Sequence, residues 1–249
     1  MKQLIVASCL LAGAQFAAAA PFSPAETHYV KLDFRSPYGG NICGGSLVGP
    51  DLVLTASHCI LDNWSGVTAH YGRHFAQRVD TERNNAKPNW IKFDHHGVAV
   101  DLALLKLSRP IAGVNGARTV PVVAQEDCNA ALGAMQANLR MAETGGQLAA
   151  SLMDVRVANI QRLGPSPLAN GVSLLANGTV GRGGDSGSPL LSPKGVQVGV
   201  YNGNAGNVSA FAALCKYAGS IKAWSEVLSP SASQTPPPGD WVWPDAARR

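Results

Sequence analysis

A six-residue segment late in the chain combines a hydroxyl group, an acid and glycines in a pattern that suits a nucleophile. Residues 184–189 read Gly-Asp-Ser-Gly-Ser-Pro, so Ser186 stands between Asp185 and Gly187. Glycine lets the backbone approach a ligand closely and adopt a positive φ. The same composition also suits an ordinary polar turn. The segment by itself therefore leaves both interpretations open.

Two further segments offer the partners that a serine nucleophile needs. His58 lies in residues 54–59, Leu-Thr-Ala-Ser-His-Cys, and Asp101 begins the apolar segment 101–107. Histidine is the usual general base near neutral pH. A carboxylate at the head of an apolar strand is costly to bury without a partner, and a histidine N–H is such a partner. A lone histidine after a strand is more often structural, so the hypothesis depends on all three segments occurring together.

The elements that must position these residues are short strands. From Tyr29 to about Val208 the chain alternates apolar stretches with Gly, Pro and Asn, and Val196, Val198 and Val200 show the two-residue period of a strand. This pattern is typical of an antiparallel β sandwich or barrel. The 27 glycines suit many tight turns.

The C-terminal part differs from the rest. Residues 217–228 place Ile221, Trp224, Val227 and Leu228 at helical spacing, which predicts one amphipathic helix. Residues 229–249 are rich in proline and serine and include Pro236 to Pro238. We expect this tail to be extended and mostly disordered.

The first twenty residues have the organisation of a secretory signal peptide. Lys2 gives a positive start, residues 4–11 are apolar, and residues 17–20 are small. A membrane anchor is the competing interpretation, but the apolar run is short and Gln15 interrupts it. We therefore expect residues 1–20 to be removed, and residues 21–228 to form the domain of a secreted, extracellular protein without a membrane span.

Cysteine usage and charge agree with export. Four cysteines follow the predicted signal, and an even number in an exported chain indicates two disulfides. Close pairs of the kind that favour zinc are missing, so no metal is expected. The four cysteines are Cys43, Cys59, Cys128 and Cys215. They allow three pairings, and all three stay open at this point. The formal net charge is +4 without a basic cluster, which argues against a nucleic-acid partner.

The motifs together resemble the chymotrypsin/trypsin family of serine proteases. The segments that carry the resemblance are 43–47 (Cys-Gly-Gly-Ser-Leu), 55–59, 101–107 and 184–189. Their order, His then Asp then Ser, is the one that this family uses. The resemblance implies an all-β fold of two packed antiparallel six-stranded β-barrels with a short C-terminal helix. The boundary between the barrels is expected near residues 114–121, with His58 and Asp101 on the first barrel and Ser186 on the second.

The resemblance also implies roles. Ser186 would be the nucleophile, His58 the general base, and Asp101 the residue that orients the histidine. The backbone N–H groups of Gly184 and Ser186 would form the oxyanion hole. The implied disulfides are Cys43–Cys59 and Cys128–Cys215. The resemblance further implies a monomer that needs no cofactor. Its partners would be polypeptide substrates and protein inhibitors.

The sequence departs from the family at the start of the mature chain. The Ile-Val-Gly-Gly start, whose ammonium group pairs with the aspartate before the serine, is missing. Asp185 would be buried, and an unpaired buried charge is costly. We expect its partner to be the amino group created by cleavage near Ala19 or Ala20. Arg140 or Arg156 is the alternative.

The predicted specificity pocket also departs from that of trypsins. Val180, six residues before Ser186, stands where trypsins carry an aspartate, and the pocket walls are expected near Tyr201 to Gly203 and at Ser209. A valine floor does not neutralise a cationic side chain. The sequence therefore predicts a neutral or apolar residue before the cleaved bond. Two other functions stay open: a catalytically silent secreted binding module, and an esterase, which fits the motif order poorly.

Overall fold

The structure is a computed structural model. It describes residues 28–72, 75–95, 98–124, 139–143, 154–158, 160–192 and 194–229. The predicted signal peptide, the tail after Ser229 and Cys128 lie outside the described residues, as do the side chains of Arg140 and Arg156.

The first half of the described chain forms one antiparallel sheet in the order β5-β4-β1-β2-β3-β7-β6. Short turns join strands that neighbour each other in the sheet, which suits the frequent Gly, Pro and Asn of this region. The strands are β1 (Tyr29–Arg35), β2 (Asn41–Leu47), β3 (Leu52–Thr55), β4 (Gly66–Tyr71), β5 (Gln77–Glu82), β6 (Trp90–His95) and β7 (Val98–Lys106).

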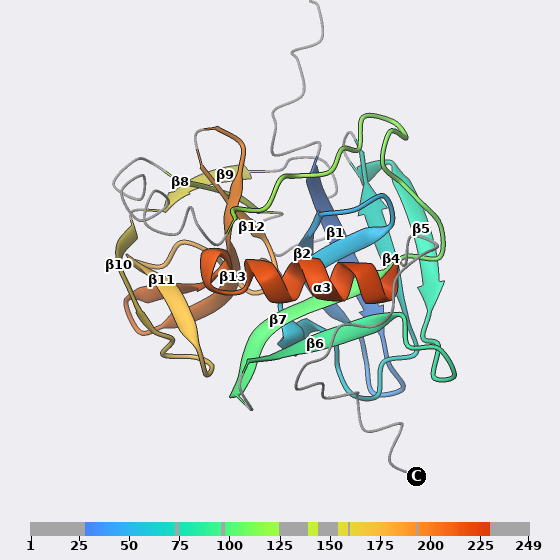
Figure 1. The fold of residues 1–249 in the computed structure, drawn as a ribbon, viewed down its shortest axis with the longest axis horizontal. Coiled ribbons are helices and arrows are strands. Elements are labelled where there is room, and N and C mark those ends of the chain that lie inside the picture. The colour runs from blue at the N-terminus through green and yellow to red at the C-terminus, as the bar shows by residue number, and fades with distance from the viewer. Residues whose placement is uncertain are drawn as a thin grey trace, which may run out of the picture.

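The second half forms another antiparallel sheet in the order β10-β11-β14-β13-β12-β8-β9. Figure 1 shows the two sheets side by side, with the helix α3 (Ala218–Leu228) lying across the face of the molecule. This helix packs against β6 and β7 of the first sheet. The strands are β8 (Leu139–Glu143), β9 (Asp154–Ala158), β10 (Ile160–Pro165), β11 (Val172–Asn177), β12 (Pro189–Leu191), β13 (Gln197–Ala205) and β14 (Val208–Ala213).

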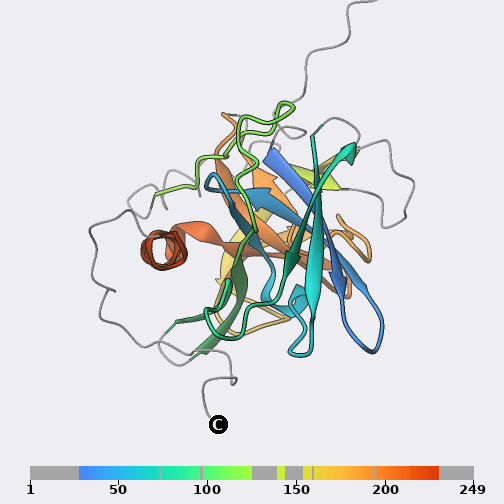
Figure 2. The same ribbon diagram turned by 90° about the vertical axis from the view of Figure 1, so that its right-hand side faces the viewer.

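The predicted fold class is confirmed: two antiparallel β halves and one C-terminal helix. In the described residues each sheet has seven strands, where six per half were expected. The number six came from the resemblance to the family, whereas the division of this chain into strands also depends on local irregularities. The register shifts between Lys92 and Asp94 in β6, and again between Ile160 and Arg162 in β10. Figure 2 shows the two sheets turned by 90°.

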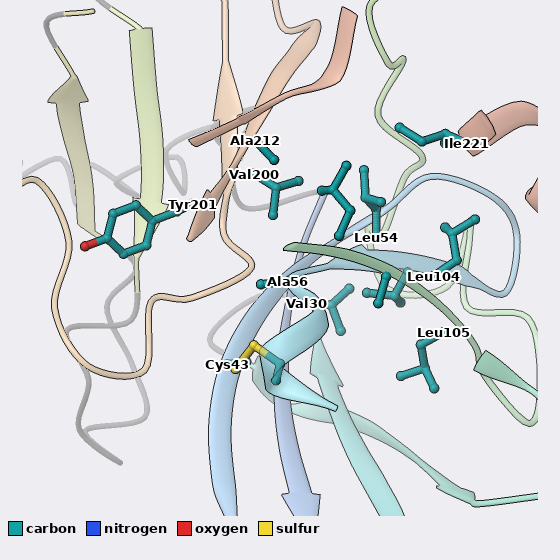
Figure 3. Close-up of a cluster of buried hydrophobic side chains, with 14 of the residues drawn as sticks. Val30, Cys43, Leu54, Ala56, Leu104, Leu105, Val200, Tyr201, Ala212 and Ile221 are labelled. Carbon is teal, nitrogen blue, oxygen red and sulfur yellow. A yellow bond between two sulfur atoms is a disulfide. The ribbon is translucent and has the colours of Figure 1, made fainter. Parts of the chain in front are cut away.

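One apolar core connects the two halves. Leu54 and Leu104 from the first sheet and Val200 and Ala212 from the second belong to the same buried cluster. Figure 3 shows these side chains gathered together. Each fully buried aliphatic side chain contributes about 1.5–3 kcal/mol relative to exposure. The core therefore holds the two sheets against each other.

Polar contacts fix how the halves meet. Ser46 Oγ on β2 donates to Gln197 Oε1 on β13 over 2.7 Å, and both side chains are fully buried. The segment between the sheets runs alongside, where Val120 N–H donates to Leu47 O over 2.8 Å. A buried polar pair of this kind is stable only when both partners meet, so it fixes the alignment of the two sheets. Within the described residues no helix has the length and apolar character needed to cross a membrane.

Candidate active site

His58 is placed by the end of a fully buried strand. β3 ends at Thr55, and the 3-10 turn η1 (Ser57–Cys59) follows at once. A disulfide between Cys43 and Cys59 ties this turn to β2, with 6.1 Å between the two Cα atoms. The predicted Cys43–Cys59 pairing is thereby confirmed. Cys215 is also disulfide-bonded, while its predicted partner Cys128 lies outside the described residues.

Asp101, on β7, holds the histidine through both carboxylate oxygens. Its Oδ2 lies 2.8 Å from His58 Nδ1, and its Oδ1 accepts the His58 backbone N–H over 3.0 Å. The Ser57 hydroxyl also donates to Oδ1 over 3.0 Å. With Nδ1–H directed at Asp101, the tautomer of the ring leaves Nε2 as the hydrogen-bond acceptor. The His58 side chain is 45% exposed, so a substrate can reach it.

A further contact to Asp101 comes from the second sheet. Asn202 Nδ2, on β13, donates to the Asp101 backbone carbonyl over 2.8 Å, and Asn202 is buried. Asn202 lies within the stretch Tyr201 to Gly203 that was predicted as a pocket wall, but its contact with Asp101 was not predicted from the sequence. The available signal was a polar side chain in the middle of an apolar strand, which needs a hydrogen-bond partner when buried.

The charge state of Asp101 follows from these contacts. Burial acts most strongly and raises the pKa of the carboxyl group. Hydrogen bonds from His58 and Ser57, together with the positive charge of a protonated His58, act in the opposite direction and prevail. The pKa of Asp101 therefore lies below its ordinary value, and the carboxylate is ionised at neutral pH.

The segment that carries Ser186 is shaped by backbone hydrogen bonds. Asp185 N–H donates to Arg182 O over 3.1 Å, and Ser188 N–H donates to Asp185 O over 3.0 Å. The Asp185 carboxylate is fully buried, as predicted, and accepts the Arg182 backbone N–H over 2.8 Å. The tight turns need a left-handed backbone at Gly184, with φ 96°.

Gly187 lets this segment press directly against the first sheet. Its φ is 87°, and a β-carbon added there would collide with Gly44 O and Thr55 Oγ1. The Ser186 carbonyl accepts the Gly44 N–H over 2.7 Å, and Cys59 Sγ lies 3.7 Å from the same oxygen. Ser186 is thus held beside the disulfide that fixes the His58 turn. The structure brings the segments of the three predicted residues together where the two sheets meet.

Two backbone donors at this place remain available. Among the described residues, neither the Gly184 N–H nor the Ser186 N–H has a hydrogen-bond acceptor within the protein. Free N–H groups beside a nucleophile are the donors that stabilise an oxyanion. Ser186 is partly exposed, so an acceptor on a substrate can approach.

The predicted pocket residues come together, but the space between them is filled. Val180 is 7% exposed, and its N–H donates to the buried Ser209 hydroxyl over 2.8 Å. The Tyr201 ring lies against Gly181 and is 1% exposed. Gly203 instead lines a neighbouring groove. Sequence reasoning missed Asn204, a residue of β13 whose side-chain amide donates to Gly181 O over 2.9 Å.

That groove begins at His58 and has a volume of about 500 Å³. It is walled by the start of β7, by the loop before β11 and by β13. Leu168 on its wall is 43% exposed and offers an apolar surface to a ligand. The lining residues are Ser57, His58, Ala99, Val100, Asp101, Leu168, Ala169, Asn170, Asn202, Gly203 and Asn204. In the described part of the chain, no group of three His, Cys, Asp or Glu side chains is arranged to hold a metal ion.

The chain is similar in sequence to proteins of the trypsin family. The family model described as Trypsin matches residues 20–224. Granzyme M of Rattus norvegicus is 28% identical over 185 residues, which cover 67% of this chain and 70% of that protein. Glucanase inhibitor protein 3 of Phytophthora infestans is 26% identical over 171 residues, or 63% of this chain and 64% of that protein. The matched region thus spans about two thirds of these relatives.

Solved structures show the same fold. HL collagenase superposes with a TM-score of 0.63 at 16% identity, covering 82% of this chain and 96% of that one. Human heparin binding protein gives a TM-score of 0.58 at 16% identity, covering 85% and 96%. At this level of identity the likeness concerns the fold alone.

Proposed function

The chain belongs to the trypsin family, and from this premise we propose that it is a secreted serine endopeptidase with a triad of Ser186, His58 and Asp101. The observation that carries the proposal is the pair of Asp101 contacts to His58, 2.8 Å to the ring and 3.0 Å to the backbone. This pair lies beside the segment of Ser186. The arrangement matches what serine hydrolysis needs: a nucleophile, a base and a group that orients the base.

The proposed reaction cleaves a peptide bond in two stages, acylation of the enzyme and hydrolysis of the acyl-enzyme. Ser186 Oγ attacks the carbonyl carbon while its proton passes to His58 Nε2. The C–N bond then breaks as His58 returns the proton to the leaving amine, and an acyl-enzyme remains. A water molecule attacks this ester, its proton passes through His58 to Ser186, and the acid product leaves. No cofactor enters either step.

The backbone N–H groups of Gly184 and Ser186 would bind the oxyanion. Each such donor is worth about 2.7–4 kcal/mol in the transition state of a comparable enzyme. Asp101 would keep the proton on Nδ1, so that Nε2 is free to act as base, and would stabilise the imidazolium that forms. The lowered pKa of Asp101 supports this role, because the carboxylate must stay ionised.

The proposed substrates are polypeptides with a neutral or apolar residue before the cleaved bond. Val180, at the place where trypsins carry an aspartate, offers no negative charge to an incoming arginine or lysine. Burying an unpaired cation beside a valine would be costly. We further propose that the protein is a monomer that binds neither nucleic acid nor membrane.

A catalytically silent binding protein is the second candidate. Its support is the similarity to a protein named glucanase inhibitor, at 26% identity. In that case the groove beside His58 would bind a polypeptide without cleaving it. The intact Ser186, His58 and Asp101 favour the enzyme.

Labelling with a small alkyl fluorophosphonate separates the two candidates. We expect the secreted, processed protein to be labelled, and the label to disappear in Ser186→Ala. Ser188→Ala is the matched control, because this neighbouring serine is fully buried and its hydroxyl has no hydrogen-bond partner among the described residues. It should label like the parent. A folded protein that does not label would reject the protease.

N-terminal sequencing of the same sample tests the proposed partner of Asp185. We expect the mature chain to begin near Ala19 or Ala20. A start well beyond Ala25 would leave Arg140 or Arg156 as the remaining candidates.

A further inference from the structure

The side chains that occupy the place of the specificity pocket come from two neighbouring strands. In the antiparallel pair β13–β14, Tyr201 stands opposite Phe211 and Asn204 stands opposite Ser209. The segment that follows Val180 passes over them and leads to Ser186. A substrate side chain that enters beside Ser186 must pass between this segment and β13.

Tyr201 fills the inner part of that space. A β-carbon added at Gly181 would lie 2.5 Å from Tyr201 Cε1 and 2.6 Å from Cζ, so the ring rests directly on the Gly181 backbone. The ring also packs against Phe211, with 5.3 Å between centroids. Figure 3 shows the Tyr201 side chain turned away from its neighbour Val200, and both belong to the same buried cluster. Successive strand residues point to opposite sides of a sheet, so the Tyr201 ring lies on the side of β13 that faces Gly181, and Val200 lies on the other side.

Asn204 closes the outer part. Its Nδ2 donates to Gly181 O over 2.9 Å, and its Oδ1 lies 2.6 Å from Ser209 Oγ. The Ser209 hydroxyl also accepts the Val180 N–H over 2.8 Å and lies 2.8 Å from Gly178 O. Asn204 therefore bridges the two walls of the pocket, and hydrogen bonds at both ends of its amide fix the side chain.

The floor is consequently out of reach. Val180 is 7% exposed and Ser209 is fully buried, so in the described part of the chain little of either side chain is open to a substrate. A long side chain could enter only by displacing the Tyr201 ring and breaking both contacts of Asn204. Forcing extra volume into a packed space is unfavourable, whereas a small substrate side chain requires no such rearrangement.

Resting on the proposed function, we infer that this chain cleaves after glycine or alanine and discriminates against every larger residue, apolar ones included. This preference is narrower than the one expected from Val180 alone, which would admit leucine or phenylalanine. Recognition then shifts to substrate residues further from the bond. The groove beside His58, with Val100, Leu168 and Ala169 on its walls, offers them apolar contacts.

The direct test is a series of peptide p-nitroanilides that differ only in the residue before the bond. We expect kcat/KM for alanine to exceed that for leucine, phenylalanine and arginine by roughly tenfold or more, since small differences in a hydrophobic site are worth this much. A higher kcat/KM for phenylalanine or leucine than for alanine would overturn the inference.

Two substitutions should open the pocket. Asn204→Gly removes the bridge, and we expect the ratio of kcat/KM for the phenylalanine substrate to that for the alanine substrate to rise roughly tenfold. Tyr201→Val, combined with Asn204→Gly, should extend the gain. Tyr201→Phe keeps the ring and should keep the preference for alanine. Asn207→Gly is the matched control for Asn204, because Asn207 is exposed at the turn of the same hairpin and should leave the preference unchanged.

Peptide binding to a variant without the nucleophile tests the pocket independently of catalysis by the triad. Product peptides that end in alanine or phenylalanine are titrated into Ser186→Ala. We expect the phenylalanine peptide to bind measurably tighter after Asn204→Gly is added, and equal binding in both backgrounds would overturn the inference. Missing fluorophosphonate labelling rejects the protease, whereas labelling with a preference for large residues rejects only the closed pocket.

Discussion

The two sides of the candidate site are built in different ways. On the side of the first sheet, side-chain hydrogen bonds and a disulfide fix His58 and Asp101. On the side of the second sheet, backbone hydrogen bonds and left-handed glycines shape the segment of Ser186. The contacts of the first side fix the position of the Asp101 carboxylate, and those of the second side fix the backbone conformation around Ser186.

The difference indicates what each side must supply. A general base works only when its tautomer and position are set, and the carboxylate of Asp101 sets both. An oxyanion hole needs N–H groups with fixed directions, which side chains do not determine. Removing the charge of Asp101 on the first side should therefore lower the turnover rate, and replacing a left-handed glycine on the second side should lower the stability of the joined sheets.

The largest effect is expected where the charge is removed without a change of shape. Asp101→Asn should lower kcat by about 10⁴-fold, the size that this substitution has in well-studied members of the family. The amide cannot hold the productive tautomer of His58. Asp62→Asn, at a carboxylate whose side chain is 95% exposed, is the control and should keep full activity. A loss below tenfold in Asp101→Asn would contradict the proposed role.

Gly187→Ala should break the second side. A β-carbon there collides with Gly44 O and Thr55 Oγ1, and φ is 87°. We expect the free energy of unfolding to fall by about 2–6 kcal/mol, the sum of backbone strain and overpacking. Denaturant unfolding measures this loss. Gly183→Ala has open space around the added carbon and should stay within about 0.5 kcal/mol of the parent. Equal stability of the two variants would show that the sheets do not meet as described.

Replacing both Cys43 and Cys59 by alanine should weaken the first side alone. The two cysteines are 16 residues apart, and a loop of this size is worth about 3 kcal/mol of stability. Because the disulfide anchors the His58 turn, kcat should fall as well, while the preference among substrate residues stays. A changed preference with unchanged stability would count against this separation of the two sides.

The smallest effect concerns pH. The pKa of Asp101 is lower in the folded protein than its unfolded value of about 3.9, so its contribution to stability is fully present above that pH. It is lost as the pH falls through the folded pKa. Between pH 6 and pH 2 the stability difference between the parent and Asp101→Asn should therefore shrink.

Asp62→Asn provides the comparison for this pH series. A hydrogen bond from Lys92 lowers the pKa of Asp62 as well, but this pair is solvent-exposed and screened. Its stability difference should change less with pH. If the stability difference for Asp101→Asn instead grew in acid, a lowered pKa of Asp101 in the folded protein would be ruled out.

Much of the catalytic side could be predicted from sequence because its residues sit in contiguous motifs. His58 adjoins Cys59, and Asp101 begins an apolar strand, so each carries a local signal. The confirmed Cys43–Cys59 pairing came from the resemblance to the family, since residue spacing left three pairings open. The roles of the three triad residues stay predictions until they are measured.

The pocket was harder to predict because it depends on strand register. The register shifts between Tyr201 and Gly203, so that Asn202 is the extra residue of a bulge. A bulge changes which later side chains face the pocket. Asn204 therefore takes the place at the pocket wall that was expected for Gly203. The residue pattern within a single strand does not reveal such a shift in register.

The bridge made by Asn204 has a consequence for how such a protein diversifies during evolution. The residues that close the pocket contact one another across one hairpin. Apart from Asn202, which donates to Asp101 O, the described contacts that hold His58 and Asp101 come from the first half of the chain. Exchanging Asn204 for a smaller residue would change which peptides are cleaved and leave the contacts of the triad in place. A lineage built on this scaffold could therefore broaden its specificity through few mutations, with turnover kept at every step.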